Sequence, residues 1–242
     1  MMQKSNLINV AVIGARGFVG NEICKVLELD DRYNLIPVVR GDNIEKYVDK
    51  ADMVIHAANP AGRFSAESNP QKDYMETVEK TYRILRSIKS KPLLLLSTLS
   101  CRTQMDINYG RNRRSCELLV LAQEGKIVRL GPMFGGNRNK DTLHDLLVGR
   151  NVYVAPETRY AYVDVSWVAS KIVDLLSSPS GLYEIGAKNA VSLSELRDHF
   201  NSKSTFSGVD DTQIPEISDD APDARLVFEF AHKELKEIES WR

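Results

Sequence analysis

Apolar runs of strand length alternate with amphipathic segments through the first half of the chain. The apolar runs occur at residues 8–13, 34–39, 51–58 and 92–97. Segments with apolar residues at helical spacing occur at residues 18–27, 44–50 and 70–87. Strands that alternate with helices favour a parallel sheet with helices on both faces. We therefore expect an α/β fold built on a doubly wound, mostly parallel sheet.

The second half of the chain is less regular. Helical patterns occur at residues 143–149, 167–176, 193–200 and 226–241, and a short strand is expected at 151–156. Ser192 and Glu195 form a capping-box pattern before the third of these helices. Residues 201–223 are polar and acidic and predict a loop. We expect a main sheet domain over residues 1–135 and a small lobe over 136–242, interleaved with the last elements of the sheet.

The composition is that of an ordinary globular protein with one substantial core. The 242 residues are 43% hydrophobic and 27% charged, and the net charge is -1. Neither nucleic acid nor a membrane surface is therefore expected as a partner. Residues 1–6 lead into the first strand without the apolar region of a signal peptide. The 3 cysteines show no paired spacing, so we expect reduced thiols, a cytoplasmic protein and no metal site.

Three glycines separate the first strand from the first helix. Gly14 permits a tight turn, Gly17 a close approach of the backbone to a pyrophosphate, and Gly20 close packing of helix on strand. The helix N-terminus then offers its free N–H groups and positive dipole end to the phosphates. The sequence therefore predicts a dinucleotide site. Its candidate residues are Gly14, Arg16, Gly17, Phe18, Val19 and Gly20.

The end of the second strand predicts which dinucleotide binds. An acidic residue there holds the ribose 2′-hydroxyl of NAD, and an arginine accommodates the 2′-phosphate of NADP. Arg40 occupies this position, and Arg16 is a second candidate cation for the same phosphate. Asp42 lies close by, and a small shift in register would place its carboxylate at the ribose instead. We expect NADP, with NAD as the alternative.

Candidate catalytic residues follow the fourth strand. Tyr109 and Arg113 are four positions apart, so on a helix they share one face. A neighbouring cation favours the phenolate, which suits a tyrosine to general acid–base catalysis. A strand-end hydroxyl could hydrogen-bond the same substrate oxygen. His56 lies within an apolar strand and is expected to be a core residue, and Cys101 lacks an evident base partner for a nucleophilic role.

Several segments together resemble a known family. They are GARGFVG, DMVIHAA, YMETVEKTYRILRS, LLLST, YGRNRRSCE, IVRLGPMFGG, AYVDVSWVAS and GLYEIGAKNAVSLSEL. In this order they resemble motifs of the extended short-chain dehydrogenases/reductases, the NAD-dependent epimerase/dehydratase family that modifies nucleotide sugars. The resemblance implies a Rossmann fold, a NAD(P) cofactor, a nucleotide-sugar substrate and, as is common in the family, a possible homodimer.

The resemblance also implies roles for individual residues. Thr98 matches the catalytic Ser/Thr and Tyr109 the catalytic tyrosine, while Arg113 occupies the place of the lysine that binds the nicotinamide ribose. The strand end at Ala57 and Ala58 is expected to contact the cofactor. The substrate candidates are Ser100, Arg138 and Arg159, the two arginines as pyrophosphate contacts. Dehydratases of the family carry Asp-Glu after the catalytic Thr, whereas Leu99 and Ser100 follow it here, so we expect reduction of a keto sugar or epimerisation.

Four departures from the family pattern leave alternatives open. Arg113 replaces the lysine, Thr77 replaces a helix asparagine, and Lys80 replaces a nearby glycine. The segment between Thr98 and Tyr109 is also shorter than usual. One alternative is a catalytically weakened sensor or scaffold that still binds NAD(P). The other is a reductase of a small non-sugar carbonyl compound.

Overall fold

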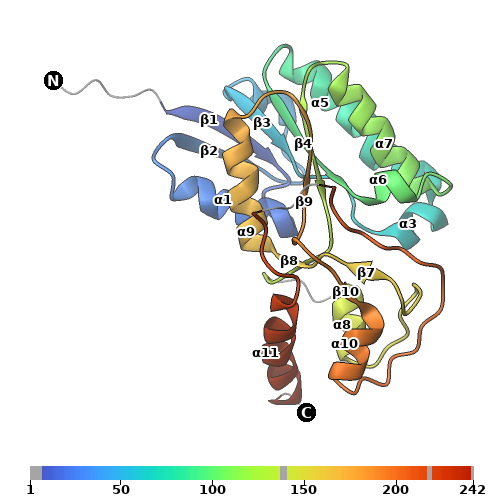
Figure 1. The fold of residues 1–242 in the computed structure, drawn as a ribbon. Helices are drawn as coiled ribbons and strands as arrows, with labels where there is room; N and C mark the ends of the chain where they lie inside the picture. The colour runs from blue at the N-terminus through green and yellow to red at the C-terminus, as the bar shows by residue number, and fades with distance from the viewer. Residues whose placement is uncertain (1–6, 137–140, 217–219, 241–242) are drawn as a thin grey trace. The chain divides into compact units, whose positions relative to one another are not determined.

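A six-stranded sheet forms in the order β2-β1-β3-β4-β5-β9, with its first five strands from residues 8–130 and its sixth from residues 181–185 (Figure 1). The computed structural model describes residues 7–136, 141–216 and 220–240. The sheet strands are β1 (Ile8–Ile13), β2 (Tyr33–Val38), β3 (Met53–His56), β4 (Leu93–Thr98), β5 (Lys126–Leu130) and β9 (Gly181–Ile185). Strand β1 runs parallel to both β2 and β3, and β3 runs parallel to β4. The predicted doubly wound, mostly parallel sheet is confirmed.

Helices cover both faces of this sheet (Figure 1). The helices in this region are α1 (Phe18–Glu28), α2 (Ile44–Val48), α3 (Arg63–Ser68), α4 (Pro70–Tyr74), α5 (Lys80–Ile88), α6 (Ser100–Thr103), α7 (Asn108–Leu121) and α9 (Val165–Asp174). Alternate residues of β1 enter different cores, and Ala11 and Ile13 pack with Ile84 of α5 and Cys116 of α7. This alternation places a continuous apolar layer beneath α5 and α7, which holds α7 against the sheet.

The helix expected over residues 70–87 is interrupted. A π-helical turn, η1 (Met75–Glu79), separates α4 from α5. Such single π turns are frequent at functional sites because they displace the side chains on one helical face. Periodicity alone could not indicate this turn, since one extra residue per turn changes the apolar pattern little. The strand expected at 151–156 is also wrong, because only an isolated bridge between Val152 and Phe206 forms there.

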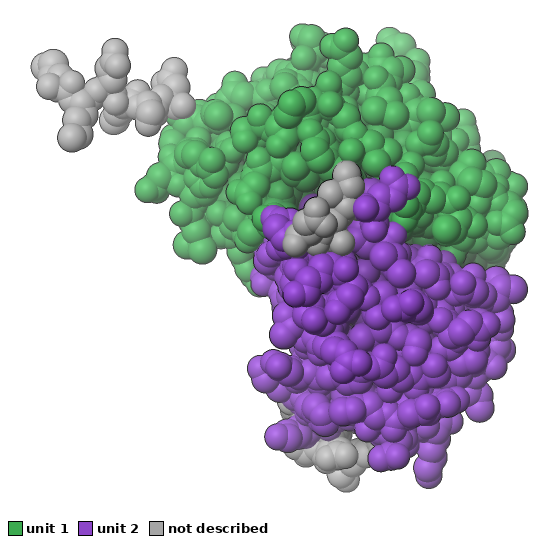
Figure 2. Space-filling model, viewed as in Figure 1, with its two compact units in different colours: residues 1–129, 169–183 green, residues 130–168, 184–242 purple. Residues whose placement is uncertain are grey.

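Contacts divide the chain into two units (Figure 2). Unit 1 comprises residues 1–129 and 169–183, and unit 2 comprises residues 130–168 and 184–242. The sequence-based boundary between residues 135 and 136 stays a prediction, because contacts alone do not define a domain.

Unit 2 contains two small sheets and three helices among its described residues. Strand β6 (Met133–Phe134) pairs with β8 (Val163–Asp164), and β7 (Arg159–Tyr160) pairs with β10 (Val191–Ser192). The helices are α8 (Thr142–Leu147), α10 (Leu193–His199) and α11 (Leu226–Ser240). The Ser192 hydroxyl accepts a hydrogen bond from the Glu195 backbone N–H at 3.1 Å, as the capping pattern predicts. A short 3₁₀ turn, η2 (Leu175–Ser177), follows α9.

The described helices contain no segment whose length and apolar character would let it cross a membrane.

Candidate active site

The glycine turn after β1 is built from closely packed backbone. Gly14 has a φ of 94°, and its N–H donates to the Val38 carbonyl of β2 at 2.9 Å. A Cβ on Gly14 would lie 2.8 Å from the carbonyl carbon and oxygen of Ala57. A Cβ on Gly20 would lie 2.2 Å from the Gly14 carbonyl oxygen. Because real side chains never approach backbone so closely, the turn requires glycine at both positions.

The start of α1 is open to an anion. Gly17 is the N-cap, and in the described part of the chain no side chain caps its helix. The first N–H groups of a helix need acceptors, and a phosphate supplies them. Phe18 and Val19, in the first turn of α1, are half-buried, and Arg16 is exposed. The predicted cofactor residues of this segment thus lie together, and their backbone fits a pyrophosphate.

Two buried polar side chains of unit 1 lack hydrogen-bond partners among the described residues. The hydroxyl of Thr77, in η1, is fully buried and forms no hydrogen bond within the described residues. The same holds for both side-chain amide atoms of Asn59, which follows β3. A buried unpaired polar group costs about 1–3 kcal/mol, so such groups fit a site that a polar ligand completes. Sequence reasoning gave neither residue as a binding candidate.

The residues after β2 differ in their freedom to bind a ribose. Arg40 is exposed. The Asp42 carboxylate accepts a hydrogen bond from the Val39 N–H at 2.8 Å and closes a turn of the chain. This bond gives Asp42 a local structural role, whereas the Arg40 guanidinium is available to a ligand at the strand end.

Thr98 and Ser100 meet at the end of β4. The Thr98 Oγ1 accepts a hydrogen bond from the Ser100 backbone N–H and donates one to the Ser100 Oγ, both at 3.3 Å. Ser97, one residue earlier, donates to the carboxylate of Glu117 at 2.6 Å. Glu117 is fully buried and also forms an ion pair with Arg129 at 2.7 Å. Burial alone would raise the pKa of Glu117. The hydrogen bonds from Arg129, Ser97 and Arg114 outweigh burial, so the pKa of Glu117 lies below its usual value.

Tyr109 and Arg113 contact each other on α7, as their spacing predicts. The Arg113 guanidinium carbon lies 3.9 Å from the centre of the Tyr109 ring. This stacking is a cation–π contact, which gains strength where water is excluded. Arg113 is 2% exposed and Tyr109 is 8% exposed. Helix α7 packs against β4, which carries Thr98 at its end.

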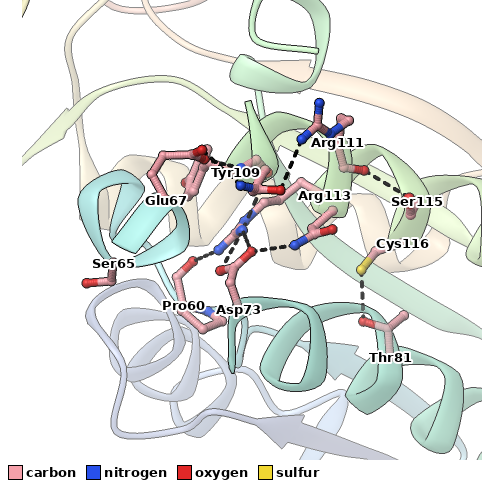
Figure 3. A network of polar contacts seen from close by, with 12 residues as sticks. Pro60, Ser65, Glu67, Asp73, Thr81, Tyr109, Arg111, Arg113, Ser115 and Cys116 are labelled. Carbon is pink, nitrogen blue, oxygen red and sulfur yellow. Dashed lines mark hydrogen bonds and ion pairs between the residues drawn. The ribbon is translucent and has the colours of Figure 1, made fainter. Parts of the chain in front are cut away.

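Arg113 is held by partners that sequence reasoning missed (Figure 3). Its Nη1 donates to both carboxylate oxygens of Asp73, at 2.9 and 2.7 Å, and its Nη2 donates to the carbonyl oxygen of Pro60. Asn112 also donates to Asp73, at 2.7 Å. A buried guanidinium requires a counter-ion, so a carboxylate partner could have been anticipated from Arg113. The position of that carboxylate in the sequence could not have been anticipated.

Glu67 of α3 fixes the start of α7. Its carboxylate accepts hydrogen bonds from the backbone N–H of Tyr109 at 3.1 Å and from the side chain of Asn108 at 2.9 Å (Figure 3). A negative group at a helix N-terminus is favourable because it meets free N–H groups and the positive dipole end. Glu67 thereby ties the loop after β3 to the helix that carries Tyr109.

The thiols and the buried histidine are not poised for chemistry. Burial and, second, the charge of Glu117 raise the pKa of the Cys101 thiol to about 12, so it stays protonated. Burial, followed by the charge of Lys80, lowers the pKa of His56 to about 3. Its Nε2 lies 3.1 Å from the Thr81 hydroxyl, which confirms the expected core histidine. The described residues contain no cluster of three or more groups suited to a metal ion.

The two substrate arginines belong to unit 2. Arg159, in β7, is exposed, and its Nη2 donates to the Ala190 carbonyl oxygen at 3.3 Å. Arg138 lies outside the described residues. Both pyrophosphate roles stay predictions.

Comparison with known proteins agrees with the sequence motifs. The model of the NAD dependent epimerase/dehydratase family matches residues 10–112. A UDP-2-acetamido-2,6-beta-L-arabino-hexul-4-ose reductase of Pseudomonas aeruginosa is 27% identical over 139 residues, which are 53% of this chain and 36% of that protein. The match therefore spans little more than a third of the relative.

Solved structures share the fold along nearly the whole chain. UDP-glucuronic acid 4-epimerase from Bacillus cereus, in complex with UDP-glucuronic acid and NAD, has a TM-score of 0.76 at 16% identity, covering 97% of this chain and 100% of that one. dTDP-4-dehydrorhamnose reductase from Bacillus anthracis, in complex with NADP, has a TM-score of 0.75 at 15% identity, covering 96% and 100%. At these identities the likeness is one of fold.

Proposed function

Since the model of the NAD dependent epimerase/dehydratase family matches residues 10–112, we propose that this chain is an NAD(P)-dependent oxidoreductase or epimerase of a nucleotide-activated sugar. One observation carries the proposal. A glycine turn that requires bare backbone follows β1, and a tyrosine stacked on a buried guanidinium lies on α7, within the same unit. The first fits a dinucleotide, and the second fits proton transfer to a sugar oxygen.

Tyr109 is the proposed general acid or base. It exchanges a proton with the hydroxyl or keto oxygen of the sugar, and Thr98 hydrogen-bonds the same oxygen. The Arg113 guanidinium stacks on the ring of Tyr109, with its carbon 3.9 Å from the ring centre, and so holds the ring in position. When bound, the nicotinamide ring supplies or accepts the hydride. Asp73 and the Pro60 carbonyl hold Arg113, so the charge beneath the ring is fixed before the substrate arrives.

NADP(H) is the proposed cofactor. Support comes from Arg40, which is exposed at the end of β2, and from Asp42, whose carboxylate is engaged by the Val39 N–H. Arg16, exposed in the glycine turn, is the second cation proposed for the 2′-phosphate. NAD is the alternative.

A keto sugar or an epimerisable sugar on a nucleoside diphosphate is the proposed substrate. Support comes from the relative that is named as a nucleotide-sugar reductase. Leu99 and Ser100 after Thr98 bring no carboxylate, which disfavours dehydration. Arg138 and Arg159 are proposed to bind the pyrophosphate through charge-assisted hydrogen bonds.

The test is turnover of Tyr109→Phe, measured as NADPH consumption with 4-keto sugar nucleotides carrying UDP or dTDP. We expect kcat to fall by about 10²-fold or more, because proton transfer by a positioned side chain contributes about 10²–10⁴-fold. Tyr153→Phe is the matched control, since Tyr153 is 79% exposed in unit 2. Full turnover by Tyr109→Phe on a substrate that the wild type reduces would refute the proposed role.

A further inference from the structure

Lys80 places an ammonium group at the end of β3. It begins α5, its side chain is half-buried, and its Nζ donates to the Ala58 carbonyl oxygen at 2.6 Å. Two turns earlier in the same helical run, Asp73 holds Arg113, whose Nη2 donates to the Pro60 carbonyl oxygen. Lys80 and Arg113 therefore donate hydrogen bonds to the two ends of the short segment 58–60, which follows β3.

Both a carboxylate and two guanidinium groups act on the ammonium of Lys80. Its ammonium donates to a neutral carbonyl and not to a carboxylate. Burial lowers the pKa of Lys80, and the charges of Arg40 and Arg113 lower it further, against an opposing effect of Glu76. An anion bound between this ammonium and the Arg40 guanidinium would be attracted by both.

The same ammonium lies close to the glycine turn. A Cβ on Gly14 would be only 3.0 Å from the Cα of Ala58, the residue whose carbonyl Lys80 binds. On its other side, Gly14 donates its N–H to Val38 of β2, two residues before Arg40. Lys80 therefore approaches the turn from β3 and Arg40 approaches it from β2, on either side of β1.

We propose that Lys80 binds the 2′-phosphate of NADP(H) together with Arg40 and so determines the preference for the phosphorylated dinucleotide. The proposal rests on the dinucleotide site described under the proposed function. The Lys80 side chain has four methylene carbons and rotates about the bonds between them. A short movement of this side chain carries the ammonium from the Ala58 carbonyl oxygen to a phosphate oxygen. An anionic phosphate oxygen attracts the ammonium by its net charge, which the Ala58 carbonyl oxygen lacks, and this difference drives that movement.

Lys80 departs from the family pattern. The family that the chain resembles has a glycine where Lys80 stands, so nothing in the resemblance supplies a cation there. In the sequence, the lysine in place of a glycine was the only indication of this role. The hydrogen bond from Lys80 to the Ala58 carbonyl oxygen places the lysine beside the proposed dinucleotide site.

The experiment compares dinucleotide affinities of the wild type, Lys80→Met and Lys72→Met by titration calorimetry with NADPH and NADH. Methionine keeps the length of the side chain and removes its charge. Lys72 is the control because it lies on the same helical run with an exposed side chain, 4.0 Å from Glu76. A second pair of probes, 2′,5′-ADP and ADP, differs in whether the 2′-phosphate is present.

We expect Lys80→Met to weaken NADPH and 2′,5′-ADP about tenfold or more, since a charged hydrogen bond contributes at least that factor. NADH and ADP should change less than twofold, and Lys72→Met should leave all four unchanged. Equal weakening of NADPH and NADH, or no change in either, would overturn the role of Lys80 while leaving the dinucleotide site intact. Failure of the wild type to bind any of the four would overturn the proposed function as well. Melting curves without ligand confirm that both variants are folded.

Discussion

The glycine turn and the Tyr109–Arg113 region are built by different means. At the turn, backbone packs on backbone, and a Cβ at Gly20 would lie only 2.2 Å from the Gly14 carbonyl oxygen. Around Arg113, side chains from separate elements form a buried polar network with Asp73 as its counter-ion. The turn depends on the lack of a side chain at its glycines. The network depends on side chains of opposite charge that lie within hydrogen-bond distance.

This difference decides how each region responds to change. The turn tolerates no Cβ at Gly14 or Gly20, and this packing does not respond to pH because it involves no ionisable group. A buried ionic network tolerates coordinated replacement and fails when one partner is lost, because an unpaired buried charge is costly. Three measurements test this contrast.

Removing Asp73 should have the largest effect on stability. In Asp73→Ala the Arg113 guanidinium, 2% exposed, stays buried without its counter-ion. We expect the free energy of unfolding, measured in urea, to fall by about 3–5 kcal/mol. Glu79→Ala is the control, because the Glu79–Arg83 pair lies on the same helical run but is exposed, and it should cost less than about 1 kcal/mol.

A double replacement sharpens this prediction. In Asp73→Leu/Arg113→Met both charges are removed, so most of the lost stability should return. If the double variant is as unstable as Asp73→Ala, then the lost stability does not arise from an unpaired charge.

Adding one methyl group to the turn should have the next largest effect. In Gly20→Ala the new Cβ collides with the Gly14 carbonyl, so we expect about 3 kcal/mol of destabilisation. Gly41→Ala separates collision from backbone strain, because Gly41 has a φ of 98° but nothing within 4 Å of its added Cβ. It should cost about 1–2 kcal/mol. Equal losses in thermal melts of the two variants would contradict close packing at the turn.

The pH dependence should give the smallest effect. His56 has a pKa of about 3 in the folded protein and about 6.5 in the unfolded chain. Below pH 6.5 the unfolded state therefore binds a proton that the folded state does not. The stabilising contribution is complete above pH 6.5 and is lost progressively as the pH falls towards 3.

The measurable consequence is a slope in the free energy of unfolding. Between pH 6 and pH 4.5 we expect His56 to account for a loss of about 2 kcal/mol. His56→Gln should flatten this part of the profile, whereas His232→Gln, at an exposed position, should not. An unchanged slope in His56→Gln would show that other groups cause it.

Local patterns in the sequence were sufficient for the fold and the turn. Strand and helix periods, with glycine at positions 14, 17 and 20, depend on contacts between near neighbours or on the absence of a side chain. The contact between Tyr109 and Arg113 likewise follows from their spacing on one face of α7. These features are visible without knowledge of distant partners.

The partners of the site could not be read in the same way. Asp73 and Pro60 meet Arg113 only because α4, the loop after β3 and α7 converge in three dimensions. Glu67 caps α7 from 42 positions away. The π turn that carries Thr77 was hidden because it leaves the apolar periodicity nearly intact.

The order of the sheet also affects how this chain is synthesised. Strand β9 completes the edge beside β5, and the Gly181 N–H bonds the Gly125 carbonyl oxygen at 3.4 Å. Roughly fifty residues separate the two strands, so at about 5–20 residues per second a ribosome needs on the order of several seconds to deliver β9 after β5. Throughout that interval the buried strand β5 presents an unpaired edge to other nascent chains. Synthesis of residues 131–180 is therefore an interval in which the growing polypeptide is exposed to aggregation.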